Sequence, residues 1–186
     1  MKIAVTGTIG SGKSAVCQYI SSKGYDVFDC DRENALLLEK GNEGYLALKE
    51  VFPECFMDEE LDKKMLSAIV FADPEKRKIL EMIMHPLILK RLQERKDDPL
   101  FAEVPLLFEA GWDSYFDHDL LIVTDTDIIV SRLEKRGMGR QDALDRLNNQ
   151  MPVEEKIKRA DKIIYNNGSL EELYAYVDMW LAEVIC

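Results

Sequence analysis

The stretch that decides the fold lies at the beginning of the chain and reads Lys2-Ile3-Ala4-Val5-Thr6-Gly7-Thr8-Ile9-Gly10-Ser11-Gly12-Lys13-Ser14. It joins a short apolar strand to the pattern G-x-x-x-x-G-K-S, and residues compatible with a helix follow from Ala15 to Lys23. Glycines let such a loop turn tightly and bring its N–H groups against a phosphate, and the helix that follows adds a partial positive charge. The combination predicts a phosphate-binding loop rather than a plain glycine-rich turn.

The end of this loop indicates which phosphate compound is bound. The Lys13 side chain is long enough to reach the β- and γ-phosphates of a nucleotide, and the Ser14 hydroxyl can hold Mg²⁺. We therefore expect the chain to bind a nucleoside triphosphate together with Mg²⁺.

Composition narrows the possible functions. The 186 residues fit one domain with a proper core, and the net charge of −11 argues against a nucleic-acid surface, which needs basic patches. The sequence contains no apolar run of about 18 residues, so we expect no membrane span. Because the chain starts directly with a core strand, we expect no cleaved signal and a cytoplasmic location. Nothing in the sequence indicates an obligatory protein partner.

The cysteines form no C-x-x-C pair, which favours buried free thiols over zinc ligands or disulfides. They are Cys17, Cys30, Cys55 and Cys186.

The order of elements predicts an α/β fold. Besides the first strand, strands are expected at 25–29, 101–104, 120–123 and 162–165, and helices at 34–40, 46–52, 61–96 and 127–136 and after Ser169. We expect Asp127 to cap the helix that it begins and Pro86 to break or kink the helical region around it. Alternation of strands and helices implies a parallel sheet with helices on both faces, and residues 32–97 form a nearly all-helical insertion.

The second strand ends in two acids, Asp29 and Asp31, separated by Cys30. They come at the carboxyl edge of the sheet, where open α/β sheets bind ligands. A carboxylate there can accept the proton of a substrate hydroxyl or hold the metal. Capping of the next helix is an equally good interpretation for one of the two acids.

A basic segment precedes the last strand. Residues 132–146 hold five basic and three acidic residues, a local charge of +2 in an acidic chain, and glycines interrupt the segment at 137 and 139. Such arginines suit a lid that closes over phosphates, although a solvated helix surface would give the same charge pattern. After the last strand, Asn166-Asn167-Gly168 is either a turn whose amides touch a base or a simple strand-to-helix turn.

Motifs in a fixed order run along nearly the whole chain: Thr6-Gly7 to Ser14, Asp29-Cys30-Asp31, Leu61-Asp62, Val70-Phe71, His85-Pro86, Val104-Pro105-Leu106-Leu107-Phe108-Glu109, Gln150-Met151-Pro152, Lys156, Ala160-Asp161 and Asn166 with Gly168. Together they resemble the dephospho-CoA kinase family. H-P, P-L-L-F-E and Q-M-P-x-x-x-K discriminate far better than the phosphate loop, which many proteins share.

The resemblance implies transfer of the γ-phosphate of ATP to the 3′-hydroxyl of the ribose of dephospho-CoA, the last step of coenzyme A synthesis. It also implies the fold of nucleoside monophosphate kinases in a single domain. That domain has a P-loop core (1–31, 98–131 and 151–186), a helical substrate-binding insertion (32–97) and a lid (132–150).

The resemblance further assigns roles to single residues. ATP phosphates are expected against Gly10, Ser11, Gly12, Lys13, Ser14 and Ala15, Mg²⁺ at Ser14, and adenine near Asn166 and Gly168. Asp31 is the expected base, with Lys13 and Arg140 as its catalytic partners. The acceptor is expected to contact Asp31, His85, Pro105, Leu106, Phe108, Glu109, Arg136 and Arg146. The residues alone also allow structural roles for these motifs. The His85-Pro86 pair can simply break a helix, and residues 105–109 can form the core of a strand with Glu109 as a cap.

Some positions depart from the family pattern. Ala35, Lys63 and Ser67 thin the positive charge expected around the pyrophosphate of the acceptor, and Glu103 replaces an aspartate. Two alternatives therefore stay open: a kinase of another small nucleotide or nucleoside, and a non-catalytic ATP-binding regulator. Either kinase would form ADP only when its acceptor is present, whereas a regulator would not.

Overall fold

The computed structural model describes residues 1–185, so Cys186 lies outside the described part of the chain. The chain divides into two compact units, residues 1–29 with 97–186 and residues 30–96. We describe each unit by itself.

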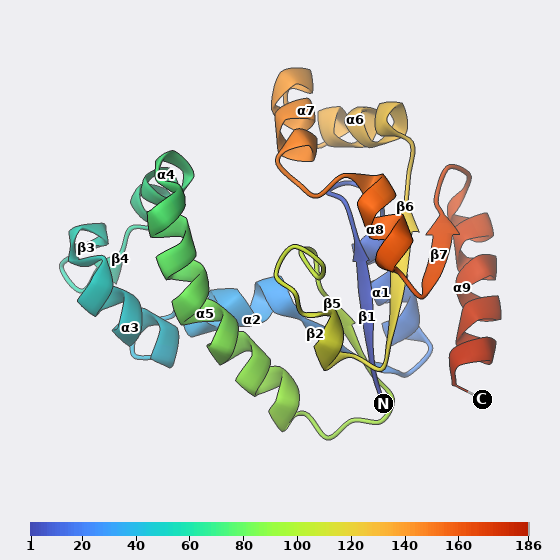
Figure 1. Ribbon diagram of the computed structural model, residues 1–186, viewed down its shortest axis with the longest axis horizontal. Coiled ribbons are helices and arrows are strands. Elements are labelled where there is room, and N and C mark those ends of the chain that lie inside the picture. The colour runs from blue at the N-terminus through green and yellow to red at the C-terminus, as the bar shows by residue number, and fades with distance from the viewer. Residues whose placement is uncertain (186) are drawn as a thin grey trace. The chain divides into compact units, whose positions relative to one another are not determined.

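The first unit is built on a five-stranded parallel sheet (Figure 1). Its strands are β1 (Lys2–Gly7), β2 (Asp26–Asp29), β5 (Leu100–Glu103), β6 (His118–Val123) and β7 (Lys162–Tyr165), and they lie in the order β2-β5-β1-β6-β7. Every neighbouring pair is parallel. β1 therefore lies in the middle, and the loop that follows it starts from the centre of the carboxyl edge.

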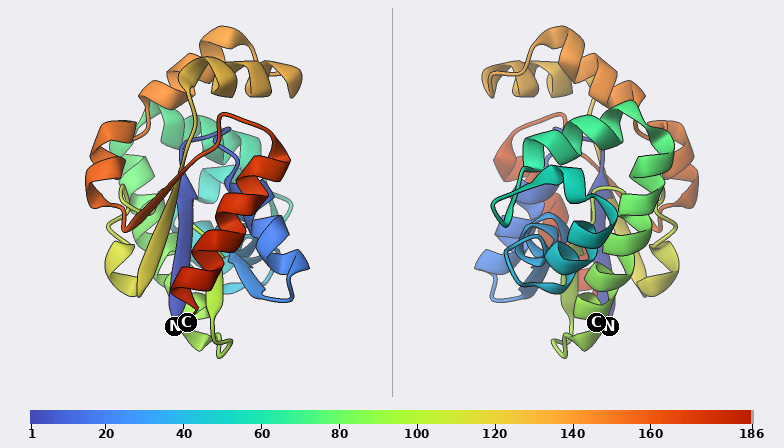
Figure 2. Two further views of the ribbon diagram at one scale, coloured as in Figure 1. Left: turned by 90° about the vertical axis from the view of Figure 1, so that its right-hand side faces the viewer. Right: turned by 90° about the vertical axis from the view of Figure 1, so that its left-hand side faces the viewer.

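Helices connect these strands and cover the sheet. They are α1 (Lys13–Ser22), α6 (Thr126–Lys135), α7 (Arg140–Asn148), α8 (Val153–Arg159) and α9 (Leu170–Val184), with one 3₁₀ turn at Asp113–Tyr115. Alternate strand residues such as Ile3, Val5 and Ile122 meet α1 and α9 in one buried cluster, in which Trp180 is 3% exposed. Figure 2 shows α1 and α9 side by side on this face, with α8 on the other. The expected parallel sheet with helices on both faces is confirmed.

The second unit is mainly helical. It contains α2 (Cys30–Leu37), α3 (Glu43–Val51), a 3₁₀ turn at Pro53–Cys55, the short strands β3 (Phe56–Met57) and β4 (Glu60–Leu61), α4 (Lys63–Ala72) and α5 (Pro74–Glu94). The antiparallel β3–β4 hairpin was not expected in a nearly all-helical insertion. Its turn residues Asp58 and Glu59 both have positive φ, of 49° and 67°, which glycine normally supplies, so the sequence carries no glycine signal for this turn.

The expected helical region 61–96 is two helices that meet at Asp73. The dipeptide Asp73-Pro74 predicts an N-cap followed by a proline at the first helical position. This prediction is confirmed, since Asp73 ends α4 and caps α5, accepting hydrogen bonds from the amides of Glu75 and Lys76. Helix α5 continues through Pro86. Proline removes only one hydrogen bond of the helix, and Met84, Ile88 and Leu92 are buried at four-residue intervals on both sides of it, so packing holds the helix together.

Two further starts differ from expectation. The helix expected at 34–40 starts at Cys30, so Asp31 lies inside its first turn. Helix α6 has Asp125 at its N-cap, and Asp127 lies in its first turn, so the prediction that Asp127 caps the helix was wrong. By contrast, the last strand occupies 162–165 as expected, and Ser169 with Glu172 forms a complete capping box.

Three cysteines are buried free thiols, as expected: Cys17, Cys30 and Cys55. Within residues 1–185, none of the helices combines the length and the apolar character that crossing a bilayer requires.

Candidate active site

The phosphate loop joins β1 to α1 and is shaped by donors that hold its carbonyl groups. The carbonyl of Ser11 accepts from the Thr124 hydroxyl at 2.9 Å and from the Asn166 side-chain amide at 2.7 Å. The Arg132 guanidinium adds a longer contact to the same carbonyl, at 3.4 Å. Ser11 itself is fully buried. Three groups that follow β6 and β7 or lie on α6 thus fix the middle of the loop with its carbonyl turned toward the protein.

Lys13 holds the first half of the loop in the same way. Its Nζ donates to the carbonyls of Gly7 and Thr8, both at 2.9 Å, and the residue is only 8% exposed. Because carbonyls of the loop face protein donors, the loop can present amides on its open side, the arrangement that binds anions. The Val16 amide donates to the carbonyl of Gly12 at 3.2 Å, so the Ser14 and Ala15 amides precede the hydrogen-bonded turns of the helix and face outward.

Gly12 is required at its position by a close approach. Its φ is +109°, and a Cβ placed there would lie 2.2 Å from Nδ2 of Asn166. Asn166 is 4% exposed, and its side chain bonds to the loop. Gly168 has a different role in the fold, since a Cβ there would lie 1.8 Å from the carboxylate of Glu172, which completes the capping box of α9. Asn166 thus lies directly against the phosphate loop, and Gly168 lies at the start of α9.

The carboxyl edge of the sheet brings hard oxygen ligands next to the loop. The Ser14 hydroxyl donates to Oε1 of Glu103 at 2.7 Å, and Asp29 stands opposite Glu103 in the β2–β5 register. A hydroxyl beside carboxylates is a donor set that Mg²⁺ accepts. Among the described residues 1–185, no three His, Cys, Asp or Glu side chains form a metal cluster. Such a site therefore fits Mg²⁺ that is shared with nucleotide phosphates, not a closed protein cage.

Helices α6 and α7 form a hairpin, which we call the arginine hairpin (126–148), beyond the carboxyl ends of the strands (Figure 1). Arg136 ends α6, Arg140 begins α7 and Arg146 lies in its last turn, and all three are exposed. Arg140 lies 3.8 Å from the carboxylate of Asp127, a surface pair that contributes little.

Arg132 behaves differently from the other arginines of this segment. Besides Ser11, it donates to the carbonyl of Asn166 at 3.1 Å and reaches the carbonyl of Gly10 at 3.5 Å. Burial, and then the charge of Arg136, lower the pKa of Arg132 below its usual range. Arg132 therefore links the loop to the turn that follows β7.

The segment 105–113 is anchored by α8. Lys156 is fully buried, and its ammonium lies 2.7 Å from Oε1 of Glu109. Arg159 donates to the carbonyl of Phe108 at 3.2 Å and to Asp113 at 2.8 Å, and its guanidinium lies 4.9 Å from the centre of the Phe108 ring.

Members of the P-L-L-F-E motif differ in burial. Phe108 is 2% exposed and Leu106 is 43% exposed, while Pro105 is half-buried. The motif therefore offers a solvent-facing side chain at Leu106, and Glu109 faces α8.

Two expected site residues belong to the second unit. Asp31 is exposed in the first turn of α2, and His85 is half-buried within α5, where burial lowers the pKa of its imidazole. Within the first unit, the structure brings together the phosphate loop, Asn166 and Arg132 of α6.

Three side chains contact the loop that were not predicted to do so: Glu103, Thr124 and Gln150. Thr124 and Glu103 each come at the end of a strand, a position that places a residue at the ligand-binding edge, and this signal could have found both. For Gln150 the sequence offers a single signal, its position in the Q-M-P motif. Its Oε1 accepts from the Ile9 amide across 141 positions of the chain, which no local pattern predicts.

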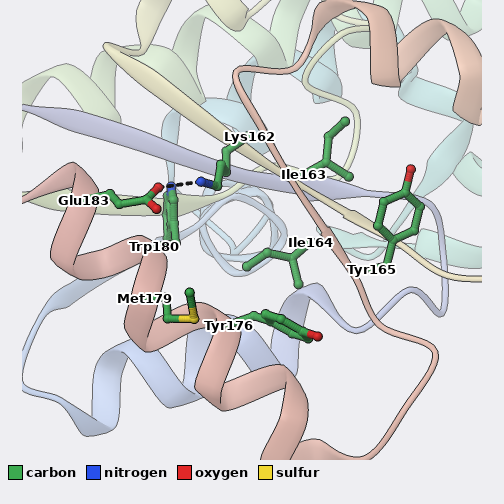
Figure 3. A pocket seen from close by; sticks show the side chains of 8 residues that line it. All are labelled: Lys162, Ile163, Ile164, Tyr165, Tyr176, Met179, Trp180 and Glu183. Atoms are coloured by element: carbon green, nitrogen blue, oxygen red, sulfur yellow. Dashed lines mark hydrogen bonds and ion pairs between the residues drawn. The ribbon is translucent and has the colours of Figure 1, made fainter.

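A separate groove of about 350 Å³ lies between β7 and α9, away from the loop (Figure 3). Tyr165, Tyr176 and Met179 line it, and an ion pair between Lys162 and Glu183 lies at its edge. This lining is mostly apolar, so the groove is not a phosphate site.

Comparison with known proteins agrees with this geometry. The sequence profile of the dephospho-CoA kinase family matches residues 1–172. A dephospho-CoA kinase of Thermus thermophilus is 42% identical over 98% of this chain and 91% of its own length. One from Thermosynechococcus vestitus is 37% identical over 96% of this chain and 92% of its own length.

Solved structures give the same result. A crystal structure from Thermus thermophilus has a TM-score of 0.86 at 39% identity and covers 98% of this chain and 97% of its own. A dephospho-CoA kinase from Campylobacter jejuni has a TM-score of 0.73 at 29% identity and covers 99% of this chain and 98% of its own. A shikimate kinase from Acinetobacter baumannii, at 15% identity and a TM-score of 0.57, shares the fold alone. The chain belongs to the dephospho-CoA kinase family.

Proposed function

We propose that this chain transfers the γ-phosphate of ATP to the 3′-hydroxyl of the ribose of dephospho-CoA, giving coenzyme A and ADP. The observation that carries the proposal is the match to one family over residues 1–172, which includes the phosphate loop and the acidic, P-L-L-F-E and Q-M-P motifs. A kinase of another small nucleotide remains the alternative to be tested, since Ala35, Lys63 and Ser67 depart from the family pattern.

The donor side rests on the phosphate loop. Its carbonyls are held by Lys13, Thr124, Asn166 and Arg132, which leaves the open side to anions. In our proposal, the Lys13 ammonium turns from the carbonyls of Gly7 and Thr8 to the transferring phosphoryl group and neutralises its oxygens. The adenine would lie near Asn166 and Gly168, beside the loop.

The metal would be held by Ser14, with Glu103 and Asp29 at the same edge of the sheet. Mg²⁺ held there would supply positive charge beside the phosphates. The Ser14 hydroxyl donates its hydrogen to Glu103, and its oxygen keeps lone pairs that could ligate the ion. Loss of the Glu103 carboxylate should therefore lower the affinity for Mg²⁺ more than the affinity for the nucleotide.

The roles of residues on the acceptor side are proposed from the family motifs. Asp31, which follows the last residue of β2 by two positions, would take the proton of the attacking 3′-hydroxyl. The oxygen of that hydroxyl then bonds to the γ-phosphorus, and the bond to ADP breaks. His85 and Leu106 would contact the acceptor, with Pro105, Phe108 and Glu109 shaping the segment.

The lid would be residues 132–150, which contain most of the arginine hairpin. Arg136, Arg140 and Arg146 are exposed there, so they are available to approach phosphates on closure. Buried free thiols support a reducing compartment, and we propose the cytoplasm as the place of the reaction.

The experiment is an ADP-release assay with dephospho-CoA, nucleoside monophosphates and nucleosides as acceptors. We expect ADP formation that depends on dephospho-CoA and far exceeds that with the other acceptors. A preference for another nucleotide would replace the acceptor assignment. ATP binding without acceptor-dependent ADP formation would make the chain a regulator.

A further inference from the structure

The connection between α7 and α8 touches the phosphate loop through one side chain. Gln150 Oε1 accepts a hydrogen bond of 2.9 Å from the backbone amide of Ile9, the third residue of the G-x-x-x-x-G-K-S pattern. The amide of Ile9 is therefore satisfied within the protein. It differs in this from the outward-facing amides at the start of α1, such as those of Ser14 and Ala15.

The side chain of the same loop residue packs into the arginine hairpin. Ile9 contacts an apolar cluster formed by buried residues of both helices, Ile129, Val130, Leu133 and Ala143, with Leu147 at its border. Gln150 is itself fixed to the hairpin, because its backbone amide donates to the Leu147 carbonyl at 3.1 Å. Ile9 is thus held by the hairpin at two points, one polar and one apolar.

Residue 151 is held from the other side. Its amide donates to Oε1 of Glu109 at 3.1 Å, and the same oxygen lies 2.7 Å from the buried ammonium of Lys156. The end of the hairpin therefore cannot shift without breaking contacts on two sides. This second anchor sets where the Gln150 carboxamide can reach.

We infer that Gln150 is a positioning residue that ties the end of the arginine hairpin to the phosphate loop, so that the hairpin closes about a point that is fixed beside the loop. It touches neither reacting atom; it acts through the Ile9 amide. This inference rests on the proposed kinase reaction, in which the loop holds the donor and the hairpin supplies positive charge.

The substitution that removes the tie is Gln150→Leu, which keeps the approximate size and loses the acceptor oxygen. In this variant the partly buried Ile9 amide loses its acceptor. We expect the loss of this hydrogen bond to lower kcat by about five- to thirty-fold. Binding of ADP should stay within about two-fold, because the amides that face phosphate are not altered. The matched control is Gln18→Leu, the same change at an exposed side chain of α1, outside the lid.

Two readouts test the inference in the full-length protein. Hydrogen exchange measured by NMR should show protection of the Ile9 amide in the wild type, in Gln18→Leu and in Gln150→Glu, which retains an acceptor oxygen. This protection should be lost in Gln150→Leu. Steady-state kinetics with dephospho-CoA and calorimetry with ADP should show a fall in kcat without a fall in affinity for Gln150→Leu, and neither change for Gln18→Leu.

Unchanged Ile9 protection or unchanged kcat in Gln150→Leu overturns the inference. An equal loss of ADP affinity and kcat also overturns it, because it would make Gln150 part of nucleotide binding. If the wild type forms no ADP with dephospho-CoA, the proposed function fails instead, and the exchange experiment still decides whether the tie exists.

Discussion

Replacing Asp119 by asparagine should stabilise the first unit, and the gain should depend on pH. Asp119 lies near the start of β6 and is 6% exposed. Its carboxylate accepts from the Asp161 amide at 3.2 Å, and its own amide donates to the Asp161 carboxylate at 3.0 Å. Burial raises the pKa of Asp119 to about 6, the nearby charges of Asp161 and Asp113 add to the rise, and the bond from the Asp161 amide opposes it.

The size of the effect follows from linkage. A rise from 3.8 to about 6 corresponds to about 3 kcal/mol, since one unit of pKa is about 1.4 kcal/mol. Because the folded state holds the proton more tightly than the unfolded state, the contribution of Asp119 to the free energy of unfolding is greatest below its unfolded pKa. It is lost as the pH rises toward the folded pKa of about 6. At neutral pH the wild type therefore carries a buried charge that costs stability.

Asp119→Asn removes this charge and keeps an oxygen that can accept from the Asp161 amide. We expect its free energy of unfolding to exceed that of the wild type by up to about 3 kcal/mol at about pH 8, with the difference vanishing near pH 4. The corresponding rise in melting temperature at the higher pH is about 5–10 °C for a chain of this size.

Urea unfolding followed by tryptophan fluorescence suits the measurement, because both tryptophans, Trp112 and Trp180, are buried in the same unit as Asp119. The control is Asp127→Asn, which changes the net charge equally at a side chain that is 95% exposed and should change stability by less than about 1 kcal/mol. A variant no more stable than the wild type at high pH, or a gain that is the same at both pH values, would refute the reasoning.

The other predictions concern catalysis. Lys13→Ala should abolish phosphoryl transfer and lower the free energy of unfolding by about 1–3 kcal/mol through the lost bonds to Gly7 and Thr8, with normal helical circular dichroism; near-wild-type turnover would contradict the phosphate-loop assignment. Arg140→Ala should lower kcat by about 10²–10³-fold and change the affinity for dephospho-CoA little, as calorimetry can check; an equal loss of affinity with unchanged kcat would make Arg140 a substrate anchor. Asp31→Asn should lower kcat by about 10²–10⁴-fold and leave the melting temperature and ATP binding nearly unchanged, because asparagine keeps the size in the first turn of α2. Asp29→Asn should be milder, and turnover of Asp31→Asn within a few-fold of the wild type would exclude Asp31 as the base.

Local patterns in the sequence were enough for much of the fold. The phosphate loop, the last strand and the capping box at Ser169 are each specified by neighbouring residues, because turns, caps and strand-to-helix junctions depend on contacts within a few positions. Alternating strands and helices likewise determined the parallel sheet.

Packing decided where local rules compete. Pro86 alone predicts a break, yet Met84, Ile88 and Leu92 keep α5 continuous through buried contacts. The β3–β4 hairpin has no glycine at its turn, so its strands were not recognised. In both cases a tertiary or conformational preference outweighed the local signal.

The candidate site was predicted only in part by sequence. The motif indicated Lys13 and Ser14, but the groups that shape the loop come from elsewhere in the chain: Thr124, Arg132, Gln150 and Asn166. They meet the loop because the sheet order places β6 next to β1 and β7 next to β6, although more than 100 residues separate β6 and β7 in sequence from β1. Hydrogen bonds act over about 3 Å, so only the folded chain determines which distant side chains reach a given backbone group. The sequence by itself predicted a phosphate-binding loop and its position in the chain, whereas the tertiary structure decided which residues hold that loop in shape.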